Sequence, residues 1–105
     1  MYLITGASGG IGRLLFEKFT DEGKVCFGTF HSTSNINHPN LSKVDVRDFD
    51  EVNMWVSNLL KDSDEKEMIL INCVGTTYNA FGHKADIDEW RNVIDVNLLG
   101  VFNAI

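Results

Sequence analysis

The chain has 105 residues, of which 44% are hydrophobic, so it can bury one modest core and form a single domain. Its formal net charge is −6 and it has no basic cluster, which makes nucleic acid and anionic membranes poor partners. No apolar run reaches the length of a membrane span, and the chain does not begin with the pattern of a secretory signal. We therefore expect a cytoplasmic protein with neither nucleic-acid nor membrane partners.

Cysteine and histidine residues show no metal or disulfide pattern. Cys26 and Cys73 fall within apolar runs, where a cysteine serves as a small buried hydrophobe. The three histidines are scattered, without the spacing of metal ligands. We predict no disulfide and no metal site.

The first half of the chain alternates between strand and helix patterns. Residues 2–5 ("YLIT") are typical of a buried strand, and residues 10–22 carry apolar side chains at helical spacing. Residues 24–30 ("KVCFGTF") predict a second strand, and the polar residues 31–40 predict a loop. Residues 41–46 ("LSKVDV") predict a short third strand.

The second half continues the alternation. Asp48 is a predicted N-cap with Glu51 in capping-box register, and an apolar stripe follows. Residues 68–74 ("MILINCV") predict a strand buried on both faces, and after a polar loop over residues 75–84, Asp86 is predicted to cap a last helix. Both tryptophans lie on the apolar stripes of these helices and are predicted core residues: Trp55 and Trp90.

This order of elements predicts an α/β fold. Strands alternating with helices imply a parallel sheet with right-handed crossovers and helices on both faces. We therefore expect about four strands, forming half of a Rossmann-like, doubly wound dinucleotide-binding domain. Ligands of such sheets bind beyond the carboxyl ends of the strands, where the loop "TGASGGIG" (residues 5–12) should lie.

The glycines of this loop suit an approaching pyrophosphate. Its oxygens need unshielded backbone N–H groups at a helix N-terminus, which a Cβ would hold off. Gly6 would permit the turn out of the strand, Gly10 the close approach, and Gly12 the packing of helix on strand. The alternative is a glycine-rich turn that serves packing only.

The spacing of these glycines carries a family resemblance. They follow G-x-x-x-G-x-G, which resembles the T-G-x-x-x-G-x-G fingerprint of the classical short-chain dehydrogenase/reductase family. The resemblance covers essentially the whole chain but only the cofactor-binding half of a family member. The cofactor-binding residues that it implies in this loop are Thr5, Gly6, Ser8, Gly9, Gly10, Ile11 and Gly12.

Two further segments extend the resemblance. "VDVRD" looks like the family's acidic segment after the third strand, so Asp45 would accept a hydrogen bond from the adenine amino group, with Val46 close by. "INCVG" resembles the family's N-N-A-G segment, in which a cysteine here replaces the second Asn and a valine the Ala. Its implied cofactor contacts are Asn72, Cys73, Val74 and Gly75.

The final predicted helix is similar to the stretch that carries the family's catalytic Asn. "WRNVIDVNLLGVFN" places Asn97 at that position, where the Asn holds a water in the proton network. Alternatively, Asn97 bonds the backbone of a neighbouring strand. The family's catalytic Ser and Tyr-x-x-x-Lys lie beyond this helix, so we expect residues 1–105 to be one domain truncated before that segment.

The choice of dinucleotide depends on the end of the second strand. An acid there would bridge the ribose hydroxyls and repel a 2′-phosphate, but the residues are Phe30, His31, Ser32 and Thr33. His31 and Ser32 could accept the phosphate, so we expect NADP(H), with NAD(H) as the alternative.

The resemblance thus implies an NAD(P)-dependent oxidoreductase. It would transfer a hydride between NADP(H) and a small-molecule carbonyl or alcohol, as a 3-oxoacyl reductase does. Phe81 or His83 could touch substrate. The helix carrying Asn97 would form a homo-oligomer in the full-length protein. The alternative is a non-catalytic dinucleotide-binding module or a partner for another subunit.

Overall fold

The computed structural model describes residues 1–32, 37–61, 67–76 and 86–105. Their strands form one parallel sheet in the order β3-β2-β1-β4, which confirms the predicted Rossmann-like fold. Because the first strand lies inside the sheet, the carboxyl ends of neighbouring strands meet beside the glycine loop. The strands are β1 (Tyr2–Thr5), β2 (Cys26–Phe30), β3 (Leu41–Lys43) and β4 (Ile69–Asn72).

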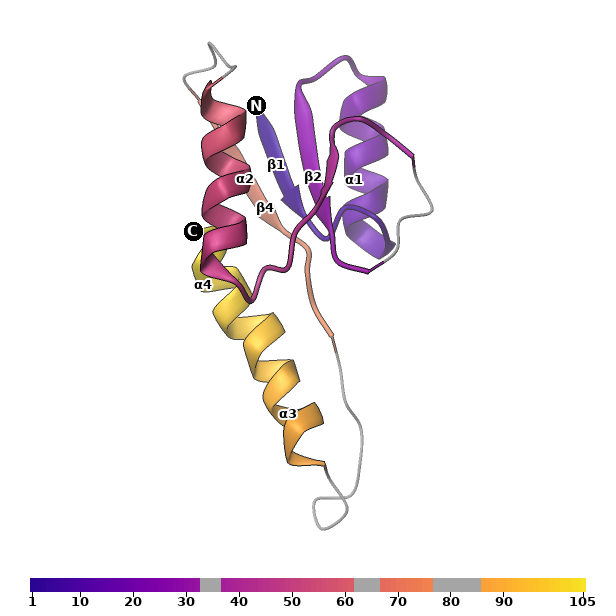
Figure 1. The fold of residues 1–105 in the computed structure, drawn as a ribbon. Helices are drawn as coiled ribbons and strands as arrows, with labels where there is room; N and C mark the ends of the chain where they lie inside the picture. Colours follow the sequence, from indigo (N-terminus) through magenta and orange to yellow (C-terminus); the bar gives the residue numbers. More distant parts are fainter. Residues whose placement is uncertain (33–36, 62–66, 77–85) are drawn as a thin grey trace.

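Helices cover both faces of this sheet (Figure 1). On one face lies α1 (Gly10–Asp21), and α2 (Phe49–Lys61) lies on the other. The C-terminal helix begins as α3 (Ile87–Ile94), which extends away from the sheet. It continues through η2 (Asp95–Leu99), a π-helical turn, into α4 (Gly100–Ala104), which packs beside α2. No helix among the described residues is long and apolar enough to cross a bilayer.

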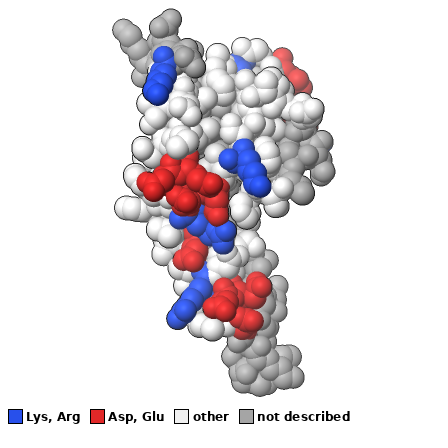
Figure 2. Space-filling view, in the orientation of Figure 1, with Lys and Arg blue, Asp and Glu red and all other residues white. Residues whose placement is uncertain are grey.

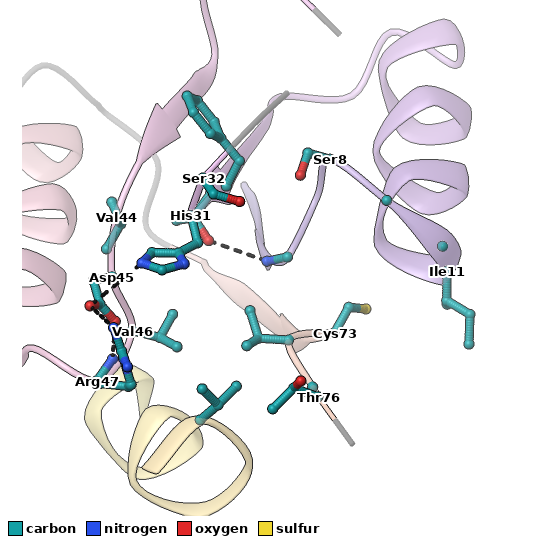
Figure 3. Close-up of a pocket in the computed structure, with 18 of the residues that line it drawn as sticks. Ser8, Ile11, His31, Ser32, Val44, Asp45, Val46, Arg47, Cys73 and Thr76 are labelled. Atoms are coloured by element: carbon teal, nitrogen blue, oxygen red, sulfur yellow. Dashed lines mark hydrogen bonds and ion pairs between the residues drawn. The ribbon is translucent and has the colours of Figure 1, made fainter. Parts of the chain in front are cut away.

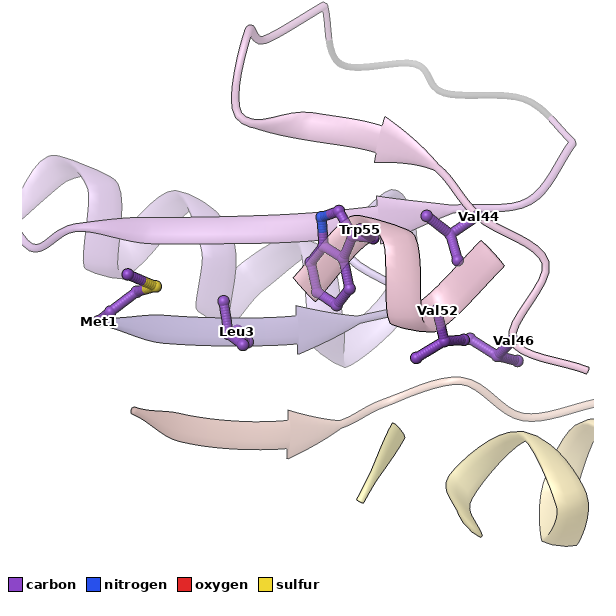
Figure 4. Packing of buried hydrophobic residues seen from close by; sticks show 6 residues of the cluster. All are labelled: Met1, Leu3, Val44, Val46, Val52 and Trp55. Carbon is purple, nitrogen blue, oxygen red and sulfur yellow. The ribbon is translucent and has the colours of Figure 1, made fainter. Parts of the chain in front are cut away.

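Two apolar cores result from the alternation of side chains along β1. Leu3 faces α2 and Ile4 faces α1, because successive side chains of a strand point to opposite faces. The core under α1 consists of Ile4, Ala7, Phe16 and Cys26. Figure 4 shows the core under α2, which consists of Met1, Leu3, Val44, Val46, Val52 and Trp55. Each fully buried large side chain contributes roughly 1.5–3 kcal/mol relative to exposure.

The two predicted N-caps are confirmed, but the capping box is not. The Asp48 carboxylate accepts from the backbone N–H of Asp50 at 2.9 Å, and that of Asp86 accepts from Asp88 at 2.8 Å. In a capping box, Glu51 would return to the N–H of Asp48. It accepts instead from the N–H of Asp45 at 2.7 Å, so it ties α2 to the segment after β3.

Other differences from the sequence predictions lie at the periphery. The third strand ends at Lys43, although the Val44 N–H still donates to the Phe30 carbonyl at 2.9 Å; the chain then turns, with the Asp48 N–H donating to the Asp45 carbonyl at 3.0 Å. The fourth strand is not buried on both faces: β4 lies at an edge of the described sheet, and Ile69 is 49% exposed. Trp55 is a core residue as predicted, whereas Trp90 is 52% exposed because α3 extends beyond the sheet.

Candidate functional site

A cleft of about 720 Å³ opens at the carboxyl ends of the strands. Parallel strands end at the same edge of a sheet, so the segments that follow them meet there. Figure 3 shows Ser8 and Ile11 on one side, with His31, Asp45 and Arg47 gathered opposite. The predicted cofactor residues that line the cleft are Gly6, Ser8, Gly9, Gly10, Ile11, His31, Ser32, Asp45, Val46, Cys73, Val74 and Gly75.

Two glycines of the loop, Gly6 and Gly12, lie too close to other backbone to carry side chains. Gly6 has φ of +70°, and a Cβ there would lie 2.9 Å from the Val74 nitrogen. A Cβ on Gly12 would lie 2.0 Å from the Gly6 carbonyl oxygen, so α1 can meet β1 only through glycine. Gly10, with φ of +56°, has open space where its Cβ would be. Gly6 and Gly12 thus shape the loop, while Gly10 borders the space of the cleft.

The start of α1 provides backbone donors. Its N-cap is Gly9, which has no side chain to accept from the first-turn N–H groups, and no acidic residue occupies that turn. These N–H groups lack acceptors within the helix, and the helix dipole adds a partial positive charge. An anionic group such as a pyrophosphate fits this end of the cleft.

Two buried threonines, Thr5 and Thr29, form hydrogen bonds that support the glycine loop and the end of β4. Thr29, which is 1% exposed, accepts from the Gly6 N–H through its side chain at 3.2 Å and from the Ala7 N–H through its carbonyl at 2.8 Å. The Thr5 hydroxyl donates to the Asn72 side chain at 3.2 Å. Thr5, Gly12 and Asn72 therefore support the cleft without lining it. Thr29 was not among the predicted site residues; its signal in the sequence is a polar residue within an otherwise apolar strand.

An ion pair occupies the opposite side of the cleft. The Asp45 carboxylate accepts from Arg47 Nε at 2.9 Å, from Arg47 Nη2 at 2.7 Å and from the Arg47 backbone N–H at 3.0 Å. These hydrogen bonds lower the pKa of Asp45 to about 2. His31 Nε2 lies 3.7 Å from Asp45 Oδ2. Asp45 is thus ionised at neutral pH and already paired with Arg47, a contact that the sequence did not predict.

The surroundings of this ion pair are acidic. Figure 2 shows carboxylate groups clustered on the visible face where α2 begins, with further carboxylates over α3. Arg47 is the only Lys or Arg among the described residues that line the cleft. A phosphate at this side would therefore depend on hydroxyl and imidazole groups, which His31 and Ser32 supply.

Asn97 lies outside the cleft lining, within the π-helical turn. Its side chain accepts from the Thr76 N–H and donates to the Thr76 carbonyl, both at 2.8 Å. It thereby fixes the segment after β4; the alternative expected a bond to the backbone of a strand, and Thr76 lies beyond the end of β4. π-Helical turns often occur at functional sites, and the catalytic role of Asn97 stays a prediction.

The cysteine side chains are free thiols. Cys26 is buried, and this burial raises its pKa to about 11, while burial also raises the pKa of the half-buried Cys73. Both are therefore protonated at neutral pH. Within the part of the chain that the structure describes, no three His, Cys, Asp or Glu residues gather in a way that could hold a metal ion. Phe81 and His83 lie outside the described residues.

Comparisons with known proteins agree with this geometry. The family description "short chain dehydrogenase" matches residues 1–105. An uncharacterized oxidoreductase of Staphylococcus saprophyticus is 33% identical over 98% of the chain, and the 3-oxoacyl-(acyl-carrier-protein) reductase FabG of Salmonella typhimurium is 31% identical over 95%. The chain spans 45% and 44% of these two proteins, respectively.

Solved structures show the same fold. The aldohexose dehydrogenase of Thermoplasma acidophilum superimposes with a TM-score of 0.86 at 31% identity, covering 98% of this chain and 40% of that one. A short-chain dehydrogenase/reductase of Vibrio parahaemolyticus gives a TM-score of 0.80 at 24% identity, covering 99% of this chain and 52% of that one. The chain belongs to the short-chain dehydrogenase family, which confirms the resemblance found in its sequence.

Proposed function

We propose that this chain supplies the dinucleotide-binding part of an oxidoreductase that transfers a hydride between NADP(H) and a carbonyl or alcohol. The observation that carries the proposal is the start of α1, where Gly9 leaves the first-turn N–H groups without a side-chain cap beside the open space at Gly10. A bound nicotinamide supplies or accepts the hydride. The chain supplies the cradle that orients it.

Each side of the cleft has a proposed part of the dinucleotide. The N–H groups at Gly10 and Ile11 would hold the pyrophosphate, because an anion is favoured at that helix end. Val46 and Asp45 would hold the adenine, with Asp45 accepting from its amino group. The segment after β4, which comprises Cys73, Val74 and Gly75, would hold the nicotinamide half.

The preference for NADP(H) over NAD(H) rests on the end of β2. The cleft-lining residues there are Phe30, His31 and Ser32, which include no carboxylate to repel a 2′-phosphate. Ser32→Asp introduces such a carboxylate. We expect it to shift the ratio of NADPH to NADH affinity toward NADH by about tenfold or more. An unchanged ratio would place the 2′-phosphate elsewhere.

The substrate class is proposed from the relatives. Several of them are named 3-oxoacyl-(acyl-carrier-protein) reductases, so a 3-oxoacyl thioester is the first carbonyl to test.

The proposed role of Asn97 is to hold a water in the proton network of the catalytic half, beside the backbone of Thr76 that it already binds.

Self-association is proposed through the C-terminal helix. Its exposed apolar side chains include Ile87, Trp90, Leu98 and Phe102, which are 52% to 72% exposed. Exposed apolar side chains of this kind favour burial against another chain. The expectation is a homo-oligomer of the chain as its source makes it, measured by sedimentation.

The experiment that tests the function is NADPH oxidation by the chain as its source makes it, with a 3-oxoacyl thioester. We expect NADPH binding in every case and turnover where the catalytic Ser, Tyr and Lys are present. A non-catalytic dinucleotide-binding module or subunit partner, the second candidate, would lack those residues and would bind NADPH without turnover. Failure to bind either dinucleotide would contradict both candidates.

A further inference from the structure

The segment from Asp45 to Arg47 is fixed by three helical elements. From α2, Glu51 accepts the Asp45 N–H at 2.7 Å. From α3, the Asn92 side-chain oxygen accepts from Arg47 Nη1 at 2.8 Å. From α4, Asn103 donates to the carbonyls of Val46 and Arg47 at 2.9 and 3.1 Å. This short loop is therefore held from several directions, which is unusual for a surface connection.

Arg47 is the centre of this arrangement. Its guanidinium forms a two-point contact with Asp45 and a third contact with Asn92, so it connects the loop after β3 to α3 across 45 positions of sequence. Such forked contacts fix the plane of a carboxylate as well as its charge. Figure 3 shows Asp45 and Arg47 together at the side of the cleft, with His31 next to them.

The donors around Asp45 leave one acceptor position toward the cleft. A carboxylate has about four acceptor positions, two on each oxygen. Oδ1 accepts from Arg47 Nε and from the Arg47 backbone N–H, so both of its positions are used. Oδ2 accepts from Arg47 Nη2, while His31 Nε2, at 3.7 Å, is too far for a hydrogen bond. The second position of Oδ2 therefore remains for a donor between Arg47 and His31.

We propose that Arg47, fixed by Asn92, is a positioning residue that orients Asp45 Oδ2 to recognise the amino group of adenine. This inference rests on the proposed dinucleotide function. Arg47 fills both acceptor positions of Asp45 Oδ1 and one of Oδ2, and it fixes the plane of the carboxylate. A donor group of the ligand therefore meets one acceptor, the remaining position of Oδ2, in a fixed orientation. Through Asn92, helix α3 takes part in base recognition although it lies at the margin of the cleft.

A direct phosphate contact of Arg47 fits the geometry less well. Three of the five N–H donors of this guanidinium are already engaged, because Nε and Nη2 bind Asp45 and Nη1 binds Asn92. A phosphate that approached Arg47 would compete with these contacts. The base-recognition role requires no such approach, because an amino group is a donor.

The test compares NADPH with its hypoxanthine analogue, in which a carbonyl oxygen replaces the amino group. Binding of both is measured by fluorescence titration of the full chain and of the variants Arg47→Met, Arg47→Lys, Asn92→Ala and Asp45→Ala. The matched control is Arg13→Met, which removes another arginine paired with an acid but outside the cleft. The readout is the ratio of the two affinities, which a general loss of stability does not change.

The expected ratios of NADPH affinity to analogue affinity follow from one charge-assisted hydrogen bond, from the adenine amino group to Asp45. The unchanged protein and Arg13→Met should favour NADPH by about tenfold or more. Arg47→Met should lose most of this preference, Arg47→Lys should recover part of it, and Asn92→Ala should lower it by about twofold to threefold. In the Asp45→Ala background, Arg47→Met should have no further effect on the ratio.

Different failures have different meanings. If Arg47→Met weakens both dinucleotides equally, Arg47 is only structural and the inference is wrong. If the unchanged protein binds NADPH without discriminating against the analogue, Asp45 does not read the base, and the inference falls while the dinucleotide function stands. If neither dinucleotide binds, the proposed function falls as well. Should Arg47→Met fail to fold, a ratio unchanged by Asn92→Ala overturns the proposal by itself.

Discussion

Replacing Gly12 with alanine tests the contact that places the cleft beside the sheet. In an open helical position, Gly→Ala stabilises a helix by about 1 kcal/mol. Gly12 lies within α1, but its added Cβ would lie 2.0 Å from the Gly6 carbonyl oxygen and 3.1 Å from Cys73 Cβ. The first neighbour is backbone and cannot rotate away, so overpacking should cost about 2–3 kcal/mol, the upper end of its usual range, and should exceed the helical gain. A decrease in the free energy of unfolding therefore indicates the close contact between Gly12 and the Gly6 carbonyl, and an increase indicates its absence.

The assay is urea unfolding followed by tryptophan fluorescence and circular dichroism, since Trp55 is buried in the core under α2. We expect Gly12→Ala to lower the free energy of unfolding by about 1–2 kcal/mol. Gly9→Ala is the control: its Cβ would meet nothing within 4 Å, so it should lose only the preference of an N-cap for glycine over alanine, about 0.5 kcal/mol. A Gly12→Ala protein as stable as the unchanged one would refute the packing of α1 on β1 described above.

Two further predictions concern polar contacts around the cleft. Arg47 lowers the pKa of Asp45 to about 2 in the folded protein, whereas the pKa of an unfolded Asp is about 4. The ionised Asp45 therefore stabilises the fold fully above about pH 4. This stabilisation is lost as the pH falls toward 2. Asp45→Asn should therefore lower stability at pH 7 by about 1 kcal/mol after solvent screening, with the difference vanishing near pH 2; a pH-independent difference would contradict this. Asn97→Ala removes both hydrogen bonds to Thr76, so hydrogen exchange of the Thr76 N–H should accelerate by about tenfold or more; unchanged exchange would contradict the contact.

The strand and helix order could be predicted because it depends on local patterns. The run before Gly6, the stripe containing Val52 and Trp55, and the N-caps Asp48 and Asp86 are each encoded within a few neighbouring residues. The parallel direction of the strands then followed from general rules of chain connection. The glycine loop was predictable as well, since the spacing of glycines indicates directly where the backbone turns tightly or lies close to other backbone.

The contacts between distant segments could not be predicted. The sequence predicted no role for Arg47, and nothing in its neighbourhood indicates that Asn92 would accept from its guanidinium. Glu51 had a plausible local partner in Asp48, yet the N–H of Asp45 lies closer once β3 ends early. The π-helical turn around Asn97 also has no periodic signal, because it shifts the register of a helix whose apolar pattern remains continuous.

The central claim is that a dinucleotide pyrophosphate binds at Gly10, and NADPH titration of two matched variants tests it most directly. Gly10→Ala and Gly23→Ala place alanine at similar positive φ angles, +56° and +78°, with nothing within 4 Å of either Cβ. Backbone strain is therefore similar, but only Gly10 lines the cleft. We expect Gly10→Ala to weaken NADPH binding by about tenfold or more and Gly23→Ala to leave it unchanged. Equal affinities of the two variants would contradict the proposed site.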